Sequence, residues 1–305
     1  MKTMYIIFSA GLFLLSCGTE PNTDGFFLNE NGVTIKCPGV NIGETGIVDG
    51  IEYEAVDRAL LEQRIEEGAN LSKVCVSNIN DMAALFAGTD FNEPIDNWDV
   101  SSVTSMRAMF AQSRFNQPIE NWDVGSVTNM SRMFWRSSFN QPIDKWDVSS
   151  VTSTASMFKL SPFNQPLNSW DVSSVTHMYE MFAGFSNTEG VEESAFNQPL
   201  DQWDVSSAIY MSNMFAYSPF NQPLETWDVS SARHMSAMFI NTPFNHPLDS
   251  WDVSSATNMS GMFADTPFNQ PINEWCVESF TQEPLDFSKN APLTPENTPV
   301  WGTCP

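Results

Sequence analysis

A repeat of 24 residues is the feature that most constrains how this chain can fold. The copy that begins at Phe115 starts Phe-Asn-Gln-Pro-Ile-Glu-Asn-Trp-Asp-Val, and similar copies follow one another from Phe91 to Trp275. Segments with a fixed short period stack, so that each copy buries its apolar face only against its neighbours. We therefore predict one elongated body with a continuous core. The Phe-Asn dipeptides lie 24 residues apart, with one step of 33, at Phe91, Phe115, Phe139, Phe163, Phe196, Phe220, Phe244 and Phe268.

Two patterns inside each copy predict mixed secondary structure. Met106, Met109 and Phe110 have the i, i+3 and i+4 spacing of one face of a short helical turn. The β-branched pair Val103-Thr104 recurs in later copies and could add one rung per copy to a parallel sheet. The predicted fold class is an α/β solenoid of about eight 24-residue repeats.

The segments that flank the repeats have the features of caps. The ends of a solenoid expose core unless atypical terminal units cover them. Before the repeats, Val56, Leu60 and Leu61 belong to a pattern that predicts an amphipathic helix within residues 53–67. We place the N-terminal cap at residues 37–74, the repeat solenoid at 75–275 and the C-terminal cap at 276–305.

Four cysteines support these caps. They lie at positions 37, 75, 276 and 304, and four cysteines outside the cytoplasm suggest two disulfides, although sequence alone permits three pairings. One pair brackets the region before the repeats, and the other brackets the region after them. We therefore predict Cys37–Cys75 and Cys276–Cys304. A zinc site is not expected, because zinc ligands are closely spaced and these cysteines are not.

The first residues have the pattern of an export signal. Lys2 supplies a positive charge, and residues 4–15 are apolar but too short to cross a bilayer as a permanent helix. The string Leu-Leu-Ser before Cys17 resembles the bacterial lipobox, in which the cysteine becomes acylated. We expect a signal peptide over residues 1–16, lipidation of Cys17 and a flexible tether over residues 17–36. The alternative is an ordinary cleaved signal peptide with an incidental cysteine.

Charge and motif content exclude two classes of function. A net charge of −24 and a pI near 4.1 disfavour nucleic acid as a partner, because phosphate binding needs clustered lysine and arginine. The chain has three histidines, and no phosphate loop, metal motif or nucleophile with its base is evident. Acid pairs recur in most copies, whereas an active site should be unique. We expect a monomer that is not an enzyme and has no cofactor.

The repeated strings carry a family likeness. Phe-Asn-Gln-Pro-Ile/Leu, Trp-Asp-Val-Ser-Ser-Val-Thr and Met-Phe, with the closing strings Trp-Cys-Val and Trp-Gly-Thr-Cys-Pro, resemble the BspA-like leucine-rich-repeat surface lipoproteins of bacteria, also called DUF285. The resemblance covers residues 75–305. It implies a right-handed, leucine-rich-repeat-like coil on a secreted or surface protein, with adhesion proposed for some members. Because Met, Phe, Val and Trp replace the usual leucines, a smooth concave sheet does not follow.

A column of aspartates that precede Val-Ser-Ser permits two interpretations. Each aspartate could accept bonds from local backbone amides as an Asx turn, which is the interpretation that we favour. Alternatively, calcium could bind between neighbouring copies and relieve the repulsion between like charges. The aspartate-rich nonapeptide of calcium-binding β-rolls is absent. The calcium candidates are Asp123, Asp147, Asp171, Asp204 and Asp228.

One long copy and three rings suggest a recognition surface. The 33-residue step contains an insertion over residues 187–195, and insertions into repeats form loops that often bind. In three consecutive copies, the position before the first methionine of the Met-x-x-Met-Phe string holds an aromatic ring, and such rings are favoured at recognition surfaces. A passive insertion and neutral drift are the alternatives. The ligand-binding candidates are His177, Tyr179, Tyr210, His234, Glu189, Glu192 and Glu193.

Trp135 departs from a column of mostly small residues. We expect it to pack against Arg114 or Arg136. The alternative is that Trp135 is an exposed anchor for a ligand.

Three functions are consistent with these features. We favour a surface lipoprotein of the bacterial envelope, held to the outer membrane or cell surface by acyl chains, whose solenoid binds a protein or glycan ligand. The first alternative is a structural or calcium-dependent component of a surface layer, and a remote alternative is a glycan-active enzyme. The step from architecture to adhesion rests on the family likeness.

Overall fold

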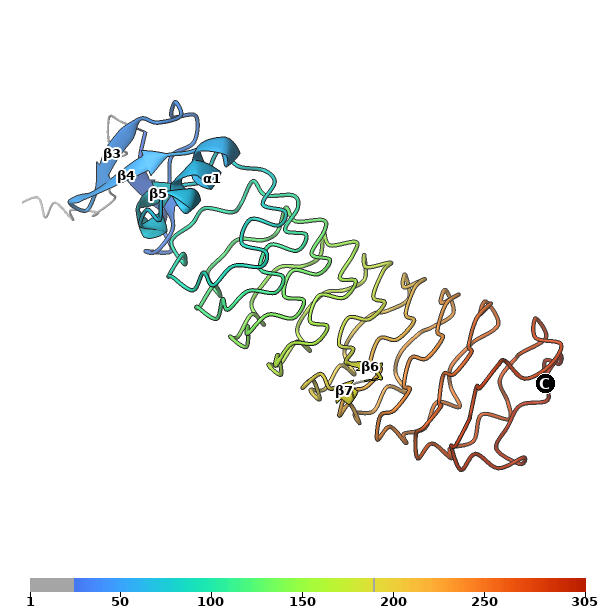
Figure 1. The fold of residues 1–305 in the computed structure, drawn as a ribbon. Coiled ribbons are helices and arrows are strands. Elements are labelled where there is room, and N and C mark those ends of the chain that lie inside the picture. The colour runs from blue at the N-terminus through green and yellow to red at the C-terminus, as the bar shows by residue number, and fades with distance from the viewer. Residues whose placement is uncertain (1–24, 189) are drawn as a thin grey trace, which may run out of the picture.

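The chain forms an elongated stack of turns with a small folded unit at its N-terminal end (Figure 1). This computed structural model describes residues 25–188 and 190–305, so the expected signal peptide, the lipidation site Cys17 and the candidate Glu189 lie outside the described residues. Most of the described strands and helices belong to the N-terminal unit, whereas the repeats consist of turns joined by isolated bridges.

The N-terminal unit contains two small sheets. Strands β1 (Phe27–Leu28) and β2 (Ile35–Lys36) pair antiparallel. The second sheet has the order β3-β4-β5, in which β3 (Thr45–Val48) pairs antiparallel with β4 (Ile51–Ala55), and β4 pairs parallel with β5 (Val74–Cys75).

The packed part of the chain begins earlier than the sequence predicted. Phe26 is fully buried in a cluster with Ile35 and Tyr53. Ile35 also forms a parallel bridge to Trp98, in the first full copy. Residues 26–36, which we expected to belong to a flexible tether over residues 17–36, therefore contribute to the N-terminal cap instead.

The predicted cap helix is shorter than expected. Helix α1 (Arg58–Glu66) begins after Asp57, whose Oδ1 accepts a bond from the Leu60 amide at 2.8 Å, and Leu61 faces the core. The 3-10 helix η1 (Leu71–Lys73) follows it. Residues 51–55, which the helix prediction partly included, form β4 instead, because alternate residues such as Tyr53 and Ala55 are buried there.

A disulfide lies at each end of the repeats. Cys37 is bonded to Cys75, and Cys276 is bonded to Cys304. Beyond the last copy, the Phe263 amide donates to the carbonyl of Phe287, and the Phe287 side chain is fully buried. The C-terminal segment therefore covers the apolar end of the stack.

Backbone hydrogen bonds join each copy to the next. The amides of Met106, Ala108 and Phe110 donate to carbonyls one copy further on, at 2.9 to 3.0 Å. Parallel bridges connect one position of every copy. The bridged position is thus the residue that follows the Val-Thr pair, one residue beyond the predicted rung. The right-handed, leucine-rich-repeat-like solenoid stays a prediction, which these contacts support. The bridged positions are Asp81, Ser105, Asn129, Ser153, His177, Tyr210, His234 and Asn258.

The Met-x-x-Met-Phe segments are turns rather than the helical turns that we expected. Ala108 and Gln112 each have a φ of 56°, in the left-handed region, and equivalent residues of most other copies do the same. These left-handed residues let alternate amides point toward the next copy, where a helix would have used them within the segment. Met106, Met109 and Phe110 are nevertheless buried, as the apolar spacing predicted.

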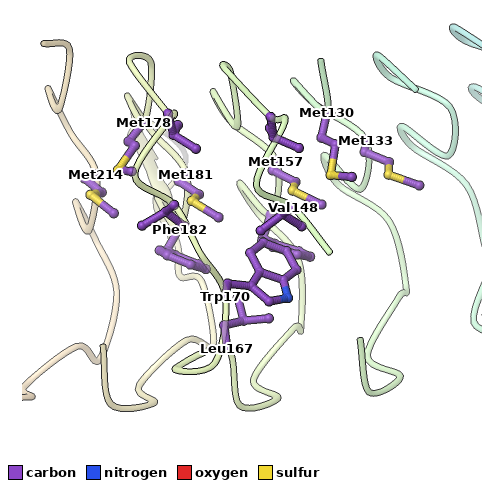
Figure 2. Close-up of a cluster of buried hydrophobic side chains, with 14 of the residues drawn as sticks. Met130, Met133, Val148, Met157, Leu167, Trp170, Met178, Met181, Phe182 and Met214 are labelled. Carbon is purple, nitrogen blue, oxygen red and sulfur yellow. The ribbon is translucent and has the colours of Figure 1, made fainter. Parts of the chain in front are cut away.

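Aromatic columns fill the interior. The rings of Phe110 and Phe115 stack with centroids 4.0 Å apart, and the methionines of successive copies lie in rows above Trp170 and Leu167 (Figure 2). Each column tryptophan also donates from its indole nitrogen to the copy before it, as Trp146 does to the Ile119 carbonyl at 3.1 Å. A buried indole needs such an acceptor, and the backbone of the preceding copy supplies it.

The left-handed conformation of Ala108 predicts whether a glycine at this position raises or lowers the stability of the protein. Ala108→Gly should leave the protein as stable or stabilise it, because an L-residue in the left-handed region costs roughly 1–2 kcal/mol and glycine does not. A helical Ala108 would instead make the same change destabilising by about 1 kcal/mol. The midpoint of urea unfolding measures the effect. Ala111→Gly is the matched control and should destabilise, since the φ of Ala111 is not positive.

Candidate recognition surface

Three of the predicted ligand-binding residues form a continuous ring stack. The rings of His177 and Tyr210 lie 4.6 Å apart at 22°, and those of Tyr210 and His234 lie 5.0 Å apart at 3°. Parallel bridges between the same residues hold this arrangement. The structure therefore brings together the rings that the repeat register placed in neighbouring copies.

The ring stack borders a shallow pocket with a volume of about 360 Å³. Tyr179 and Tyr210 contribute rings, and each of these residues is 37% exposed. Polar groups that could accept or donate hydrogen bonds lie beside them, so the pocket combines aromatic faces with polar edges. Its lining residues are Tyr179, Glu180, Tyr210, Ser212, Asn213 and His234.

The insertion forms a β-hairpin that reaches back toward earlier copies. Its strands are β6 (Phe185–Asn187) and β7 (Gly190–Glu192), paired antiparallel, and Figure 1 shows them on one side of the stack. Glu192 pairs with Arg136 at 2.9 Å. Glu193 is exposed. The hairpin thus directs Glu192 to an ion pair with an earlier copy, not to the pocket beside the ring stack.

Gly184 permits the hairpin to begin where it does. Its amide donates to the Ala216 carbonyl at 2.7 Å, so its backbone still follows the repeat. A Cβ at this position would overlap the carbonyl oxygens of Tyr217 and Glu192. Only glycine fits between the returning hairpin and the next copy.

Trp135 packs against a different arginine from the two that we expected. The guanidinium of Arg132 lies 5.9 Å from the centre of the Trp135 ring. The two expected partners are engaged elsewhere, since Arg114 pairs with Asp90 at 2.8 Å and Arg136 pairs with Glu192.

Sequence reasoning missed the ion pair between Lys159 and Glu180. The lysine nitrogen lies 2.6 Å from a carboxylate oxygen of Glu180, whose other oxygen accepts from Ser156 at 3.0 Å. Glu180 also lines the pocket beside the ring stack. A usable signal was present, because six of the seven cationic residues between positions 76 and 275 lie within residues 107–159.

The calcium candidates make local turns. Oδ1 of Asp147 accepts from the Ser149 amide at 3.1 Å and from its hydroxyl at 2.6 Å, and Asp171 makes the same pair of bonds with Ser173. The serine hydroxyl and then the serine amide lower the pKa of each carboxyl below its ordinary range. Asp123, Asp204 and Asp228 accept the equivalent amide bond.

A metal site would need several ligands in one place. Within residues 25–188 and 190–305, no three His, Cys, Asp or Glu side chains are grouped so that they could hold a metal ion. One oxygen of each candidate aspartate already accepts a bond from its own chain. These observations favour the Asx interpretation of the column.

The aspartate turns predict a pH-dependent contribution to stability. Asp147→Ala should lower the melting temperature at pH 7, because the Ser149 amide and hydroxyl lose their acceptor. The folded-state pKa of Asp147 lies below its ordinary value of 3.8, so the contribution is present above that value and is lost as the pH falls below it. Melting curves between pH 7 and pH 3 measure the narrowing difference.

The exposed Ser150 provides the control for this experiment. Ser150→Ala should match the unmodified chain at every pH. A difference between Asp147→Ala and the unmodified chain that stayed constant down to pH 3 would show that the carboxylate does not stabilise the turn.

Metal removal tests the other interpretation of the aspartate column. Excess EDTA should leave the melting temperature unchanged, and added calcium chloride should not raise it, because a ligand stabilises a fold only where it binds. Scanning calorimetry of the same preparation with EDTA, with calcium and with magnesium makes the comparison. A rise that is specific to calcium would assign the column to calcium binding.

The repeats match one known protein family. A profile of the family described as "Mycoplasma protein of unknown function, DUF285" matches residues 57–161, 115–190, 136–243 and 185–298. No curated protein and no solved structure matches the chain. The four ranges overlap, as expected for a repeat that aligns in several registers. Because they run without a gap over residues 57–298, well over half of the sequence, the chain belongs to the DUF285 family.

Proposed function

We propose that this chain is a lipid-anchored protein of the bacterial envelope, without enzymatic activity, whose stacked repeats bind a protein or glycan ligand. The observation that carries the proposal is the ring stack of His177, Tyr210 and His234 beside an open pocket. Aromatic and amphipathic rings supply large contact areas at recognition surfaces.

The rings are not needed for the fold. Their position is bridged through the backbone in every copy, and other copies fill it with Ser105, Asn129, Ser153 and Asn258. Tyr210 is 37% exposed, so a substantial part of this residue contacts water. Three rings in register on an otherwise polar column are therefore better explained by a ligand than by packing.

The proposed anchor rests on the sequence that precedes the stack. Leu-Leu-Ser before Cys17 resembles a lipobox, and acyl chains hold a protein to a membrane with about 0.8 kcal/mol per buried methylene. None of the helices described in residues 25–188 and 190–305 has the length and apolar character that crossing a bilayer requires. Attachment through Cys17 would leave the whole stack free to face a ligand.

A binding screen with the full-length chain in mild detergent tests the proposal. The unmodified chain is applied to an array of extracellular-matrix proteins and oligosaccharides, and the affinity for each bound component is then measured by surface plasmon resonance. Tyr210→Ala and His234→Ala should each weaken binding about tenfold or more, because each removes a ring that lines the pocket.

Asn258→Ala is the matched control, since Asn258 occupies the same column in an outer copy. It should leave the affinity unchanged. Melting curves establish that all three variants fold. Equal affinities for Tyr210→Ala and the unmodified chain, or the absence of any bound component on the array, would contradict the proposed function.

A further inference from the structure

A second pocket lies where the hairpin meets two earlier copies. Its volume is about 220 Å³. The hairpin contributes Phe185, and the remaining residues come from three consecutive copies. Pockets for drug-sized ligands measure about 300–1,000 Å³, so this one fits a smaller group. The residues that line it are Arg132, Trp135, Arg136, Lys159, Glu180 and Phe185, with Ser156 and Leu160.

The apolar side of this pocket consists of rings that do not belong to the core. Trp135 is only partly buried, whereas the column tryptophans, such as Trp146, are between 1% and 3% exposed. Phe185 is 40% exposed. The C–H face of a sugar ring packs well against such aromatic faces, because both surfaces are apolar and flat.

The charged side of the pocket has one cation in excess. Lys159 is paired with Glu180 at 2.6 Å, and Arg136 is paired with Glu192 at 2.9 Å. Arg132 lies over Trp135, and no carboxylate of the described residues pairs with it. The excess is notable in a chain with a net charge of −24, where most exposed surface would repel an anion.

An unpaired guanidinium beside an aromatic face selects a particular ligand chemistry. Arginine presents a planar fork of donors that matches the two oxygens of a carboxylate. The ring of Trp135 adds an apolar surface on which a flat apolar face of the same ligand can pack. We infer that this pocket binds an acidic sugar, namely a pyranose unit that carries a carboxylate, with the carboxylate on Arg132 and the sugar ring against Trp135.

This inference rests on the proposed function and specifies its ligand. Glu180 lines both pockets, so the second pocket adjoins the one beside the ring stack. Lys159 neutralises Glu180 at this junction, which lowers the repulsion that an acidic sugar would otherwise meet. A glycan with an acidic unit in the second pocket could continue across Tyr179 and Tyr210.

Titration calorimetry of the full-length chain in mild detergent, at pH 7 and low salt, tests the inference with three probes. Trigalacturonate carries both the sugar ring and the carboxylate. Its methyl ester keeps the ring and removes the charge, and triglutamate keeps carboxylates without a sugar. Trigalacturonate should bind at least about tenfold more tightly than either of the other probes.

Two variants locate the binding. Arg132→Gln and Trp135→Ala should each weaken trigalacturonate binding about tenfold, because they remove the guanidinium and the ring face. Arg114→Gln is the control, since Arg114 is exposed and pairs with Asp90. It should bind as the unmodified chain does. Melting curves should show that all three variants still fold cooperatively, because each changed side chain lies outside the core.

Several results would overturn the inference. One is binding of the methyl ester as tight as that of trigalacturonate, and another is an unchanged affinity of Arg132→Gln for trigalacturonate. A third is binding of triglutamate as tight as that of trigalacturonate, which would assign the pocket to acidic peptides. If the array ligand depends on Tyr210 while trigalacturonate does not bind, only the acidic-sugar assignment fails. If trigalacturonate binding depends on Arg132 while Tyr210→Ala weakens nothing, the pocket stands and the role of the ring stack fails.

Discussion

The hydrogen bonds between the backbones of neighbouring copies are the interaction on which this structure depends. Each copy contains few regular elements, so its buried amides and carbonyls need partners in the next copy. The left-handed residues at Ala108 and Gln112 make this possible, because they turn alternate amides in one direction. These hydrogen bonds require a particular backbone conformation but no particular side chain, so the side chains at these positions can vary. In the central copies they are Arg132, Ser156 and Glu180, which line the proposed sugar pocket.

The spacing between copies explains where recognition can occur. Equivalent rings of neighbouring copies lie 6.5 Å apart in the column of Trp98 and Trp122 but 5.6 Å apart in the column of Phe86 and Phe110. Bridged strands approach to about 4.8 Å. The copies therefore diverge toward the tryptophans and come closest at the bridged column. Rings stack favourably at such short distances, so the column that holds Tyr210 is the side on which side chains of successive copies can form one continuous surface.

The ring stack could be predicted from the register of the repeats, whereas the left-handed backbone conformation of the Met-x-x-Met-Phe segments could not. Once copies stack in register, equivalent positions become neighbours, which is why His177, Tyr210 and His234 could be placed together from sequence. The spacing of Met106, Met109 and Phe110 suits a helical turn and also suits the alternating turn that forms. Alanine at position 108 concealed the difference, because a glycine there would have signalled a left-handed residue. The partner of Trp135 was hidden as well, since it depends on Glu192, which binds Arg136 from 56 residues away.

Identical copies present the same surface along the whole stack, so a site that occurs at one place requires one copy to differ from the others. Glycine at position 184 allows the hairpin to leave the stack, and the ion pair between Glu192 and Arg136 folds it back over two earlier copies. That return encloses a space beside Trp135 that no regular copy could form alone. The hairpin also places Phe185 5.9 Å from Lys159, which in turn neutralises Glu180 between the two pockets. The insertion thus adds Phe185 and an ion pair to copies that already carry Arg132, Trp135 and Lys159, and the proposed ligand would be recognised where the stack departs from its repeat.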